Sequence, residues 1–414
     1  MTDFRDTAAV DAETRPWGVL QGVRPGKLAH KLADGGVALE ALPRYLREHY
    51  LLSEGNARLL TNICALQRRL LAGYNREAAI YIGVPFCPSI CGYCSFPSGI
   101  VPQDEESQQN FVNYIEHDIE NVVKLLSMQS FGALPVVSLY IGGGTPVSLA
   151  ERPFARLLQL ARRAFGSLPL KEFTVEAGRP DCITAGKLHA MEAAGVSRVS
   201  VNPQTLHDKT LALIGRGHTA ADFYRSYELA RQSKIPDVNM DLIIGLPGET
   251  AADVMYSLKE ARSLAPDNLT VHTLALKKRA AMFGGSWTQS MDACAAAELV
   301  AAAGQIASGM GMRPYYLYRQ HYMLGQLANI GYALPGKECL YNIQMMEERH
   351  TVLGIGPSAA TKVPLPDGHH LRKLYMPHNL PDYMARQQEL FAKRAGLFEG
   401  IEGGKYADHS AERH

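Results

Sequence analysis

The feature that most constrains the fold of this chain is a regular alternation of strand and helix patterns that begins near residue 79. Short runs rich in Val, Ile and Tyr recur six times, and segments with apolar residues every three or four positions lie between them. Strands joined by crossover helices form a parallel sheet, so the pattern predicts an α/β fold. The expected strands are 79–84, 137–141, 172–176, 198–202, 237–244 and 268–274, and the expected helices are 110–126, 152–165, 185–195 and 251–264.

Further patterns flank this core on both sides. Residues 16–75 contain amphipathic helix patterns, and an alanine-rich helix pattern at 292–312 is followed by a more aromatic and polar segment. The sequence therefore predicts four parts along the chain. They are a helical N-terminal extension at 1–76, the strand–helix core at 77–312, a small C-terminal module at 313–400 and a flexible tail at 401–414.

Charge and hydropathy argue against several classes of function. Lys and Arg number 42 against 41 Asp and Glu, a formal net charge of +1, so no strong field favours nucleic acid or an anionic membrane surface. The N-terminus lacks the charged-then-apolar pattern of a signal peptide, and the chain lacks an apolar run of about 18 residues. We expect a cytoplasmic protein that binds neither nucleic acid nor membrane.

Three of the seven cysteines are clustered. Cys87, Cys91 and Cys94 follow the first expected strand at the spacing C-x3-C-x2-C, whereas the other four are scattered, as is typical of reduced thiols. A structural zinc site usually has four ligands; no second C-x2-C pair or close His follows, although Cys182 or His117 could be recruited. The alternative is an iron–sulfur cluster, in which three cysteines leave one iron open to a further ligand.

Glycines and polar residues follow several of the expected strands. Three glycines in YIGGGTP (140–146) allow unusual backbone angles and let backbone N–H groups approach a carboxylate or phosphate, although a plain turn would also use them. One polar residue at a strand end is most simply a cap or a satisfied core group, but recurrence at one edge favours a polar-lined site. The polar residues at these ends are Glu176, Asn202, Gln204, Arg216, His218 and Asp241.

Together these motifs resemble the radical S-adenosylmethionine superfamily, and within it the oxygen-independent coproporphyrinogen III oxidase group. The cysteine loop CPSICGYC has an aromatic residue just before its last cysteine, and GGGTP and NMDLIIGLPGE follow in the order of that group. Four further segments look like its HemZ-type coproporphyrinogen dehydrogenase branch. They are WGVLQGVRPGKLAHKL (17–32), TVEAGRPD (174–181), VNPQTLHDKTLALIGRGHT (201–219) and NIGYALPGKECLYNIQMMEE (329–348).

The resemblance implies a fold and two cofactors. The fold is a partial (β/α)6, TIM-like barrel with a helical N-terminal extension and a small α+β C-terminal domain. A [4Fe-4S] cluster would be bound by Cys87, Cys91 and Cys94, and its fourth iron by the amino and carboxylate groups of S-adenosylmethionine. The residues that the resemblance implies around S-adenosylmethionine are Tyr81 and Tyr93 beside it, Gly143, Gly144 and Thr145 at its methionyl end, Glu176, Gln204, Arg216 and Asp241 on its charged and ribose groups, and Ile243 and Ala275 over its adenine.

The resemblance also implies an activity. An electron enters the cluster from a partner such as flavodoxin or ferredoxin and cleaves S-adenosylmethionine, giving a 5′-deoxyadenosyl radical. In the coproporphyrinogen reaction this radical removes hydrogen from a propionate, carbon dioxide is lost and a vinyl group remains. We therefore expect the chain to act on coproporphyrinogen III, in heme biosynthesis, or on a related tetrapyrrole.

Two departures from the group leave other functions open. The oxidases proper carry a fourth, required cysteine two positions after the triplet, and this chain has Phe96 there. The related heme-chaperone branch also lacks that cysteine, but its His-Asn-x-x-Tyr-Trp heme motif is matched here only by Asn329 and Tyr332. The alternatives are a heme-binding trafficking protein on the same scaffold and a radical enzyme with an unrelated substrate.

A carboxylate-rich tetrapyrrole calls for cations at the mouth of the barrel. The candidates in the sequence are Arg24, Lys27, Arg179, Lys277, Arg313 and Arg319. Each such residue is more often part of a surface or structural ion pair than a substrate contact.

Anaerobic reconstitution with iron and sulfide is expected to give about four irons per chain, the content of a single [4Fe-4S] centre. Iron, sulfide and zinc analysis of the same sample measures this. Tightly bound zinc with neither iron nor sulfide would contradict the cluster assignment.

Overall fold

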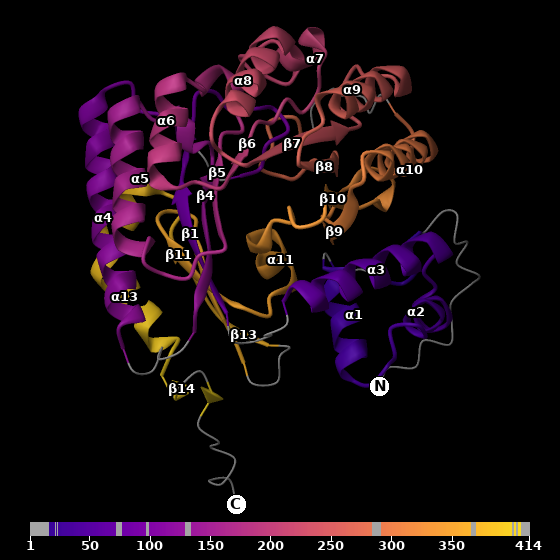
Figure 1. The fold of residues 1–414 in the computed structure, drawn as a ribbon, viewed down its shortest axis with the longest axis horizontal. Coiled ribbons are helices and arrows are strands. Elements are labelled where there is room, and N and C mark those ends of the chain that lie inside the picture. Colours follow the sequence, from indigo (N-terminus) through magenta and orange to yellow (C-terminus); the bar gives the residue numbers. More distant parts are fainter. Residues whose placement is uncertain are drawn as a thin grey trace, which may run out of the picture.

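A computed structural model describes residues 16–20, 22, 24–71, 77–96, 99–128, 134–283, 291–365, 370–399, 401–402 and 405–406. Helices cover the outside of one strongly curved sheet, and the N-terminal helices lie beside its edge at β9 (Figure 1). Within these described ranges, none of the helices has the length and apolar character needed to cross a membrane.

The main sheet has eleven strands. They are β1 (Ala78–Val84), β4 (Val136–Gly143), β5 (Glu172–Glu176), β6 (Arg198–Ser200), β7 (Asp237–Ile244), β8 (Asn268–Thr273), β9 (Arg313–Tyr318), β10 (Asn329–Ala333), β11 (Thr351–Ile355), β12 (Ala360–Pro364) and β13 (Leu371–Tyr375). Two small pairs complete the strands, β2 (Phe86–Cys87) with β3 (Gly99–Ile100), and β14 (Ile401–Glu402) with β15 (Lys405–Tyr406).

The helices follow the strands in the expected alternation. They are α1 (Pro25–Asp34), α2 (Leu42–Tyr50), α3 (Glu54–Leu70), α4 (Glu105–Leu126), α5 (Glu151–Phe165), α6 (Ala185–Ala194), α7 (Asp208–Leu213), α8 (Ala220–Gln232), α9 (Ala251–Leu264), α10 (Ala293–Gly309), α11 (Leu340–Glu347), α12 (Leu380–Ala385) and α13 (Gln387–Gly396). The six strands and four helices predicted for the core are confirmed, with ends that differ by at most five residues.

The core strands pair in sequence order and all run parallel, from β1 through β4, β5, β6 and β7 to β8. This arrangement confirms the expected α/β fold of partial-barrel type. The C-terminal strands extend the same sheet at both edges, β10 and β9 antiparallel beside β8, and β11, β12 and β13 beside β1. The division of the chain near residue 312 stays a prediction.

The sequence pattern did not predict α8, which carries the chain from β6 to β7. Thr219 and Asp222 form a reciprocal capping box at its start, in which each side chain accepts a hydrogen bond from the other residue's backbone N–H. The motif T-x-x-D before an apolar run is a known signal for a helix start, so this helix was detectable from its cap.

The amino-terminal ends of the parallel strands are closed by charge pairs and by α11. Arg198 Nη2, on β6, lies 3.2 Å from Asp237 Oδ2 on β7 and 3.7 Å from Glu172 Oε2 on β5. Glu172 also accepts the backbone N–H groups of Leu340 (2.7 Å) and Tyr341 (3.4 Å), the first two residues of α11. A carboxylate at a helix N-terminus satisfies otherwise unpaired donors, so this end of the barrel has a structural role.

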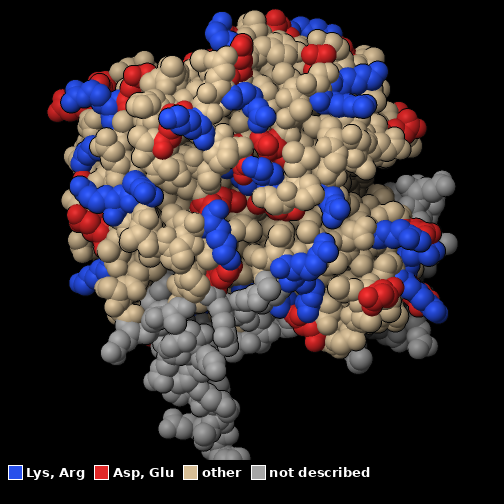
Figure 2. All heavy atoms as spheres, in the orientation of Figure 1, with Lys and Arg blue, Asp and Glu red and all other residues tan. Residues whose placement is uncertain are grey.

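The N-terminal extension joins the two edges of the sheet. Helices α1 and α3 pack against β9 at one edge. Near the other edge, the buried carboxylate of Glu348 pairs with Lys362 Nζ on β12 at 2.9 Å. The same carboxylate pairs with Arg24, directly before α1, and with Lys27 Nζ on α1 at 3.0 Å. Figure 2 shows positive and negative side chains interspersed over the visible face, with a group of Lys and Arg over α1.

Removal of the Glu348 charge is expected to weaken this junction. Burial by itself raises the pKa of Glu348, but Lys362 and Arg24 outweigh burial and bring the pKa down to about 2. A folded pKa below the unfolded value gives stability that is present above pH ~4.3 and lost as the pH falls toward 2. Glu348→Gln is therefore expected to lower the free energy of unfolding at pH 7 by about 3 kcal/mol.

Urea-induced unfolding at pH 7 and pH 3 measures this effect, and the difference between the two proteins should shrink at pH 3. Glu48→Gln is the matched control, since Glu48 pairs with Arg44 in full contact with solvent. Equal effects of the two substitutions would contradict a role of Glu348 in the junction.

Candidate functional site

The three clustered cysteines follow β1 at the carboxyl edge of the sheet: Cys87 ends β2, and Cys91 and Cys94 lie on the loop after it. Other segments hold this loop by its backbone. The N–H of Gly92 donates to the carbonyl of Ile214 (2.9 Å), and the N–H of Met282 donates to the carbonyl of Gly92 (2.9 Å). Cys91 is buried and the other two cysteines are partly exposed. The protein itself therefore fixes the position of the loop.

The glycine turn after β4 packs directly against the start of the cysteine loop. The N–H of Gly144 donates to Val84 (2.8 Å) and the N–H of Thr145 donates to Phe86 (2.6 Å). Gly143 has φ +117°, and a Cβ on Gly144 would lie 2.3 Å from the carbonyl oxygen of Phe86. Glycine is required at both positions, because a side chain would be strained at the first and would collide with backbone at the second.

Glu176 ends β5 and faces the glycine turn. Its carboxylate accepts the hydroxyl of Tyr140 at 2.5 Å and the N–H of Gly143 at 3.1 Å. Burial raises the pKa of Glu176 to about 7, although these two hydrogen bonds oppose the rise. The ring of Tyr81, on β1, stacks on that of Tyr140 with centroids 6.2 Å apart. The structure thus brings Tyr81 and Glu176 together beside the turn.

Asp241 lies on β7 with an amide group on each side of its carboxylate. Asn202 Nδ2 donates to Oδ2 (2.9 Å) and Asn239 Nδ2 donates to Oδ1 (2.8 Å). Gln204 has a left-handed backbone, φ +68°, which lets it pair with β7 through both its N–H, to Asp241, and its carbonyl, from Ile243. This pairing holds Gln204 next to Asp241.

Arg216 connects the polar edge of the sheet to the cysteine loop. Its buried guanidinium donates to the carbonyl oxygens of Gly178 (2.5 Å) and Asn202 (2.9 Å) and to the hydroxyl of Tyr93 (3.2 Å). Tyr93 lies within the cysteine triplet, so one side chain links the loop to the ends of β5 and β6.

An apolar cluster lies beside these polar groups. Ile243 packs with Ile214, Leu246 and Leu274, and Tyr93 covers the cluster. Ala275 follows directly after Leu274 and pairs with Met323 in an isolated bridge. Of the eleven residues that the resemblance suggested for one cofactor site, Tyr81 and Asp241 lie within β1 and β7, and the other nine lie at or after the carboxyl ends of the strands.

Known proteins are similar to this chain in sequence and in fold. The family model described as the radical SAM superfamily matches residues 81–261. A Bacillus subtilis protein described as oxygen-independent coproporphyrinogen-III oxidase-like protein HemZ is 37% identical over 354 residues, which cover 84% of this chain and 70% of that protein. The chain belongs to the radical SAM superfamily.

Other radical SAM relatives differ in their described roles. The heme chaperone HemW of Bacillus subtilis is 34% identical over 207 residues, which cover 49% of this chain and 52% of that protein. The solved structure of coproporphyrinogen III oxidase (HemN) from Escherichia coli matches with a TM-score of 0.59 at 20% identity, covering 79% of this chain and 73% of that chain. The last likeness shows a shared fold.

The residues of the site fit S-adenosylmethionine and an iron–sulfur cluster, the two groups that membership of the radical SAM superfamily implies. Within the described part of the chain, no three His, Cys, Asp or Glu side chains are close enough to share one metal ion. Cysteines on a cubane cluster each bind a different iron, so they need not share one metal ion. Thr145 Oγ1, Gln204 Oε1 and Arg216 Nε are buried without a hydrogen-bond partner in the protein, as expected where a polar ligand binds.

Only two of the six candidate substrate cations lie beside the cysteine loop. Arg179 donates to Ser89 Oγ at 2.9 Å, and Lys277 is close enough to Cys94 for the thiolate to oppose the lowering of the lysine pKa by burial. The other four lie elsewhere: Arg24 and Lys27 pair with Glu348, Arg319 stacks over Trp17 at 5.4 Å, and Arg313 is exposed at the start of β9.

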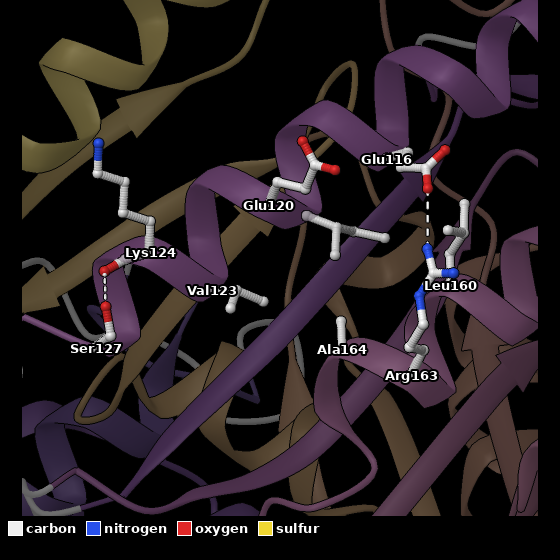
Figure 3. Close-up of a pocket in the computed structure, with 9 residues that line it drawn as sticks. Glu116, Glu120, Val123, Lys124, Ser127, Leu160, Arg163 and Ala164 are labelled. Atoms are coloured by element: carbon white, nitrogen blue, oxygen red, sulfur yellow. Dashed lines mark hydrogen bonds and ion pairs between the residues drawn. The ribbon is translucent and has the colours of Figure 1, made fainter.

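Two groups near Asp241 were not suggested by the sequence. His272 Nε2, on β8, lies 3.5 Å from Asp241 Oδ2, and the Tyr318 hydroxyl, on β9, lies 3.3 Å from His272 Nδ1. No motif marks either residue, because the register between β8 and the C-terminal strands is a tertiary feature. Figure 3 shows a pocket on α4 and α5, where Glu116 pairs with Arg163 at 3.0 Å; it contains none of the site residues.

Replacement of Glu176 by Gln is expected to stabilise the protein in a pH-dependent way. The folded pKa of about 7 lies above the unfolded value, so the favourable effect of the neutral carboxyl is present below pH ~4.3 and lost as the pH rises through 7. Glu176→Gln should raise the free energy of unfolding at pH 8 by about 1–3 kcal/mol and change it much less at pH 5. Thermal unfolding at both pH values measures this, and a variant less stable than wild type at pH 8 would contradict it.

Proposed function

We propose that the chain binds a [4Fe-4S] cluster through Cys87, Cys91 and Cys94, binds S-adenosylmethionine against the strand ends, and acts on coproporphyrinogen III or a related tetrapyrrole. The observation that carries this proposal is the meeting of the cysteine loop, the glycine turn and the buried polar side chains at one edge of a radical SAM fold. When bound, the two groups supply hydrogen-atom abstraction from an unactivated C–H bond.

The polar residues suit different parts of S-adenosylmethionine. Arg216 offers a permanently charged planar fork with Nε still unpaired, which suits the carboxylate. Glu176 suits the ammonium group, because a cation beside a carboxyl of raised pKa favours its ionised form. Asp241 and Gln204 offer acceptors for ribose hydroxyls. The free-energy cost of burying each of these polar side chains is then compensated by a ligand group of matching chemistry.

The remaining residues shape and cover the cofactor. Gly143, Gly144 and Thr145 bring backbone and a hydroxyl close to the methionyl end. Ile243 and Ala275 form an apolar surface for the adenine, with the ring of Tyr93 over the same cluster. Tyr81 fills the interior side of the turn through its stacking on Tyr140.

The HemZ relative supports a tetrapyrrole as the substrate, because that relative is described as a coproporphyrinogen-III oxidase-like protein. Lys277 lies partly exposed near the cysteine loop and is available for a propionate carboxylate. Arg179 is buried, and its guanidinium already donates to Asp181 and Ser89. The electron for the cluster comes from a reducing partner such as flavodoxin or ferredoxin. Cys87 and Cys94 are partly exposed at the carboxyl edge of the sheet, where such a partner can approach.

A heme-binding trafficking role is the second candidate. Phe96 stands where the oxidases proper carry a required cysteine, and its side chain is 69% exposed. Relatives described as the heme chaperone HemW match from several bacteria. A protein of this kind would bind heme in stoichiometric amounts and would not cleave S-adenosylmethionine in response to coproporphyrinogen.

An anaerobic assay with reductant separates the two roles. We expect 5′-deoxyadenosine to form when coproporphyrinogen III is added and mass spectrometry to detect loss of carbon dioxide from a propionate. Heme bound one to one without substrate-dependent cleavage would support the second candidate. Cleavage that no tetrapyrrole stimulates would leave the substrate assignment wrong.

The cysteine assignment has its own control. Cys91→Ala is expected to abolish cleavage and lower bound iron by at least tenfold, while far-UV circular dichroism stays unchanged because Cys91 lies in a loop. Cys294→Ala, at an exposed position on α10, should behave as wild type. Normal iron content in Cys91→Ala would contradict its role as a ligand.

A further inference from the structure

Exposed apolar side chains gather around the cysteine loop. Within the described part of the chain eleven large hydrophobic residues are exposed, and five of them lie on this loop or on segments that contact it. A gathered group of this kind marks an interaction site, whereas single exposed apolar residues need no explanation. The five, which we call the loop rim, are Ile90 (43% exposed), Phe96 (69%), Ile100 (53%), Phe283 (40%) and Tyr322 (65%).

The first part of the loop rim is tied to the cysteines themselves. Ile90 lies directly before Cys91 in the loop. The backbone N–H of Phe96 hydrogen-bonds to the sulfur of Cys94, and Ile100 pairs with Cys87 across β2 and β3. Cys87 and Cys94 are the two partly exposed cysteines. These apolar side chains therefore lie beside the ligands through which the proposed cluster is nearest to solvent.

The second part of the loop rim comes from two later segments of the chain. Phe283 follows Met282, whose N–H donates to the carbonyl of Gly92 in the cysteine loop at 2.9 Å. The ring of Phe283 meets that of Tyr322 edge to face, with centroids 6.1 Å apart. Residues from three segments far apart in the sequence thus form one apolar group, which is rich in aromatic rings as protein interfaces are.

A positively charged turn borders this apolar group. The N–H of Ala280 donates to the carbonyl of Lys277 at 2.8 Å, so Lys278 and Arg279 are the central residues of a tight turn, and both are exposed. The chain as a whole is almost neutral, with a formal charge of +1. The segments that carry the rim and the turn, 87–96, 99–100, 276–283 and 319–324, contain no Asp or Glu. The surface therefore favours a partner with an acidic face.

The form of the surface favours a protein over a small molecule. A small ligand binds in a concave site that covers most of its surface, whereas the Phe96 side chain is 69% exposed. Electron-transfer complexes bury a small area, below about 1,200 Å² in total, and five apolar side chains with two cations suit an interface of that size. The partner that has to approach the cysteines from outside is the electron donor.

We infer that the loop rim, with Lys278 and Arg279, is the docking surface for a small acidic electron-transfer protein. This inference rests on the proposed function and assigns its reducing partner a place. One electron passes from the reduced donor to the cluster, so the donor is oxidised and the cluster reduced by one electron, and no covalent bond forms. Phe96 then has a role in donor binding.

Anaerobic stopped-flow absorption with the reconstituted full-length chain tests the inference. The probe is a reduced flavodoxin with acidic residues around its flavin, and the observable is the rate of cluster reduction. Phe96→Ser is expected to lower this rate at least fivefold at limiting flavodoxin, the effect of losing an interface anchor. Lys278→Glu with Arg279→Glu should lower the rate about tenfold at low salt and much less at 0.5 M salt, where ~4 Å screening removes the charge effect.

Calorimetric titration with oxidised flavodoxin measures binding separately from reduction, and the same two variants should bind it more weakly. The matched control is Val123→Ser with Lys124→Glu, which removes an exposed apolar residue and a cation from α4 and should behave as wild type. All variants should contain wild-type iron and give the same final amount of reduced cluster with dithionite, because a small reductant needs no docking surface.

The inference is wrong if flavodoxin reduces the rim variants as fast as wild type, or if the α4 control slows equally. It is also wrong if Phe96→Ser loses binding of coproporphyrin or of anionic vesicles, or self-association, while its reaction with flavodoxin is unchanged. Reduction of the wild-type cluster by dithionite but not by flavodoxin would likewise contradict it and leave the proposed function standing. A chain that holds no reducible cluster would overturn the proposed function itself.

Discussion

Parallel pairing of the six core strands is the constraint on which the rest of the structure depends. All six strands, β1, β4, β5, β6, β7 and β8, run in one direction. Residues separated by more than 60 positions in the sequence, such as Glu176 and Asp241, therefore lie on the same side of the sheet. The opposite edge is closed by Arg198 between carboxylates and by Glu172 at the start of α11. Arg198 Nε and the Tyr341 hydroxyl at that end are buried without a hydrogen-bond partner, and so are several polar atoms at the carboxyl edge.

A carboxyl of raised pKa at Glu176, an unpaired Nε on Arg216 and unpaired amide oxygens on Asn202 and Gln204 all lower the stability of the ligand-free fold. A chain selected for stability alone would have no reason to keep them. S-adenosylmethionine, which the radical SAM superfamily implies, carries an ammonium group, a carboxylate and hydroxyls, and these groups are complementary in chemistry to the unpaired atoms.

The sequence predicted the core strands because strands and helices depend on local patterns, whereas the resemblance to the radical SAM superfamily supplied most of the candidate site residues. Period-two and period-3.6 hydrophobicity marks β4 or α5 without knowledge of their neighbours, and polar residues directly after strands share one edge in any parallel sheet. The remaining features are tertiary. Nothing in the segment after residue 312 shows that β9 and β13 lie at opposite edges, or that Glu348 pairs with Arg24. Candidate cations could be named, but their partners could not.

Electron–nuclear double resonance on the reduced, anaerobically reconstituted protein with labelled S-adenosylmethionine tests the central claim most directly. The account predicts hyperfine coupling of the [4Fe-4S] cluster to 15N in the amino group and to 17O in the carboxylate, because three cysteines leave one iron open to both. A cluster that shows neither coupling at saturating S-adenosylmethionine, or a protein that holds no cluster, would contradict it.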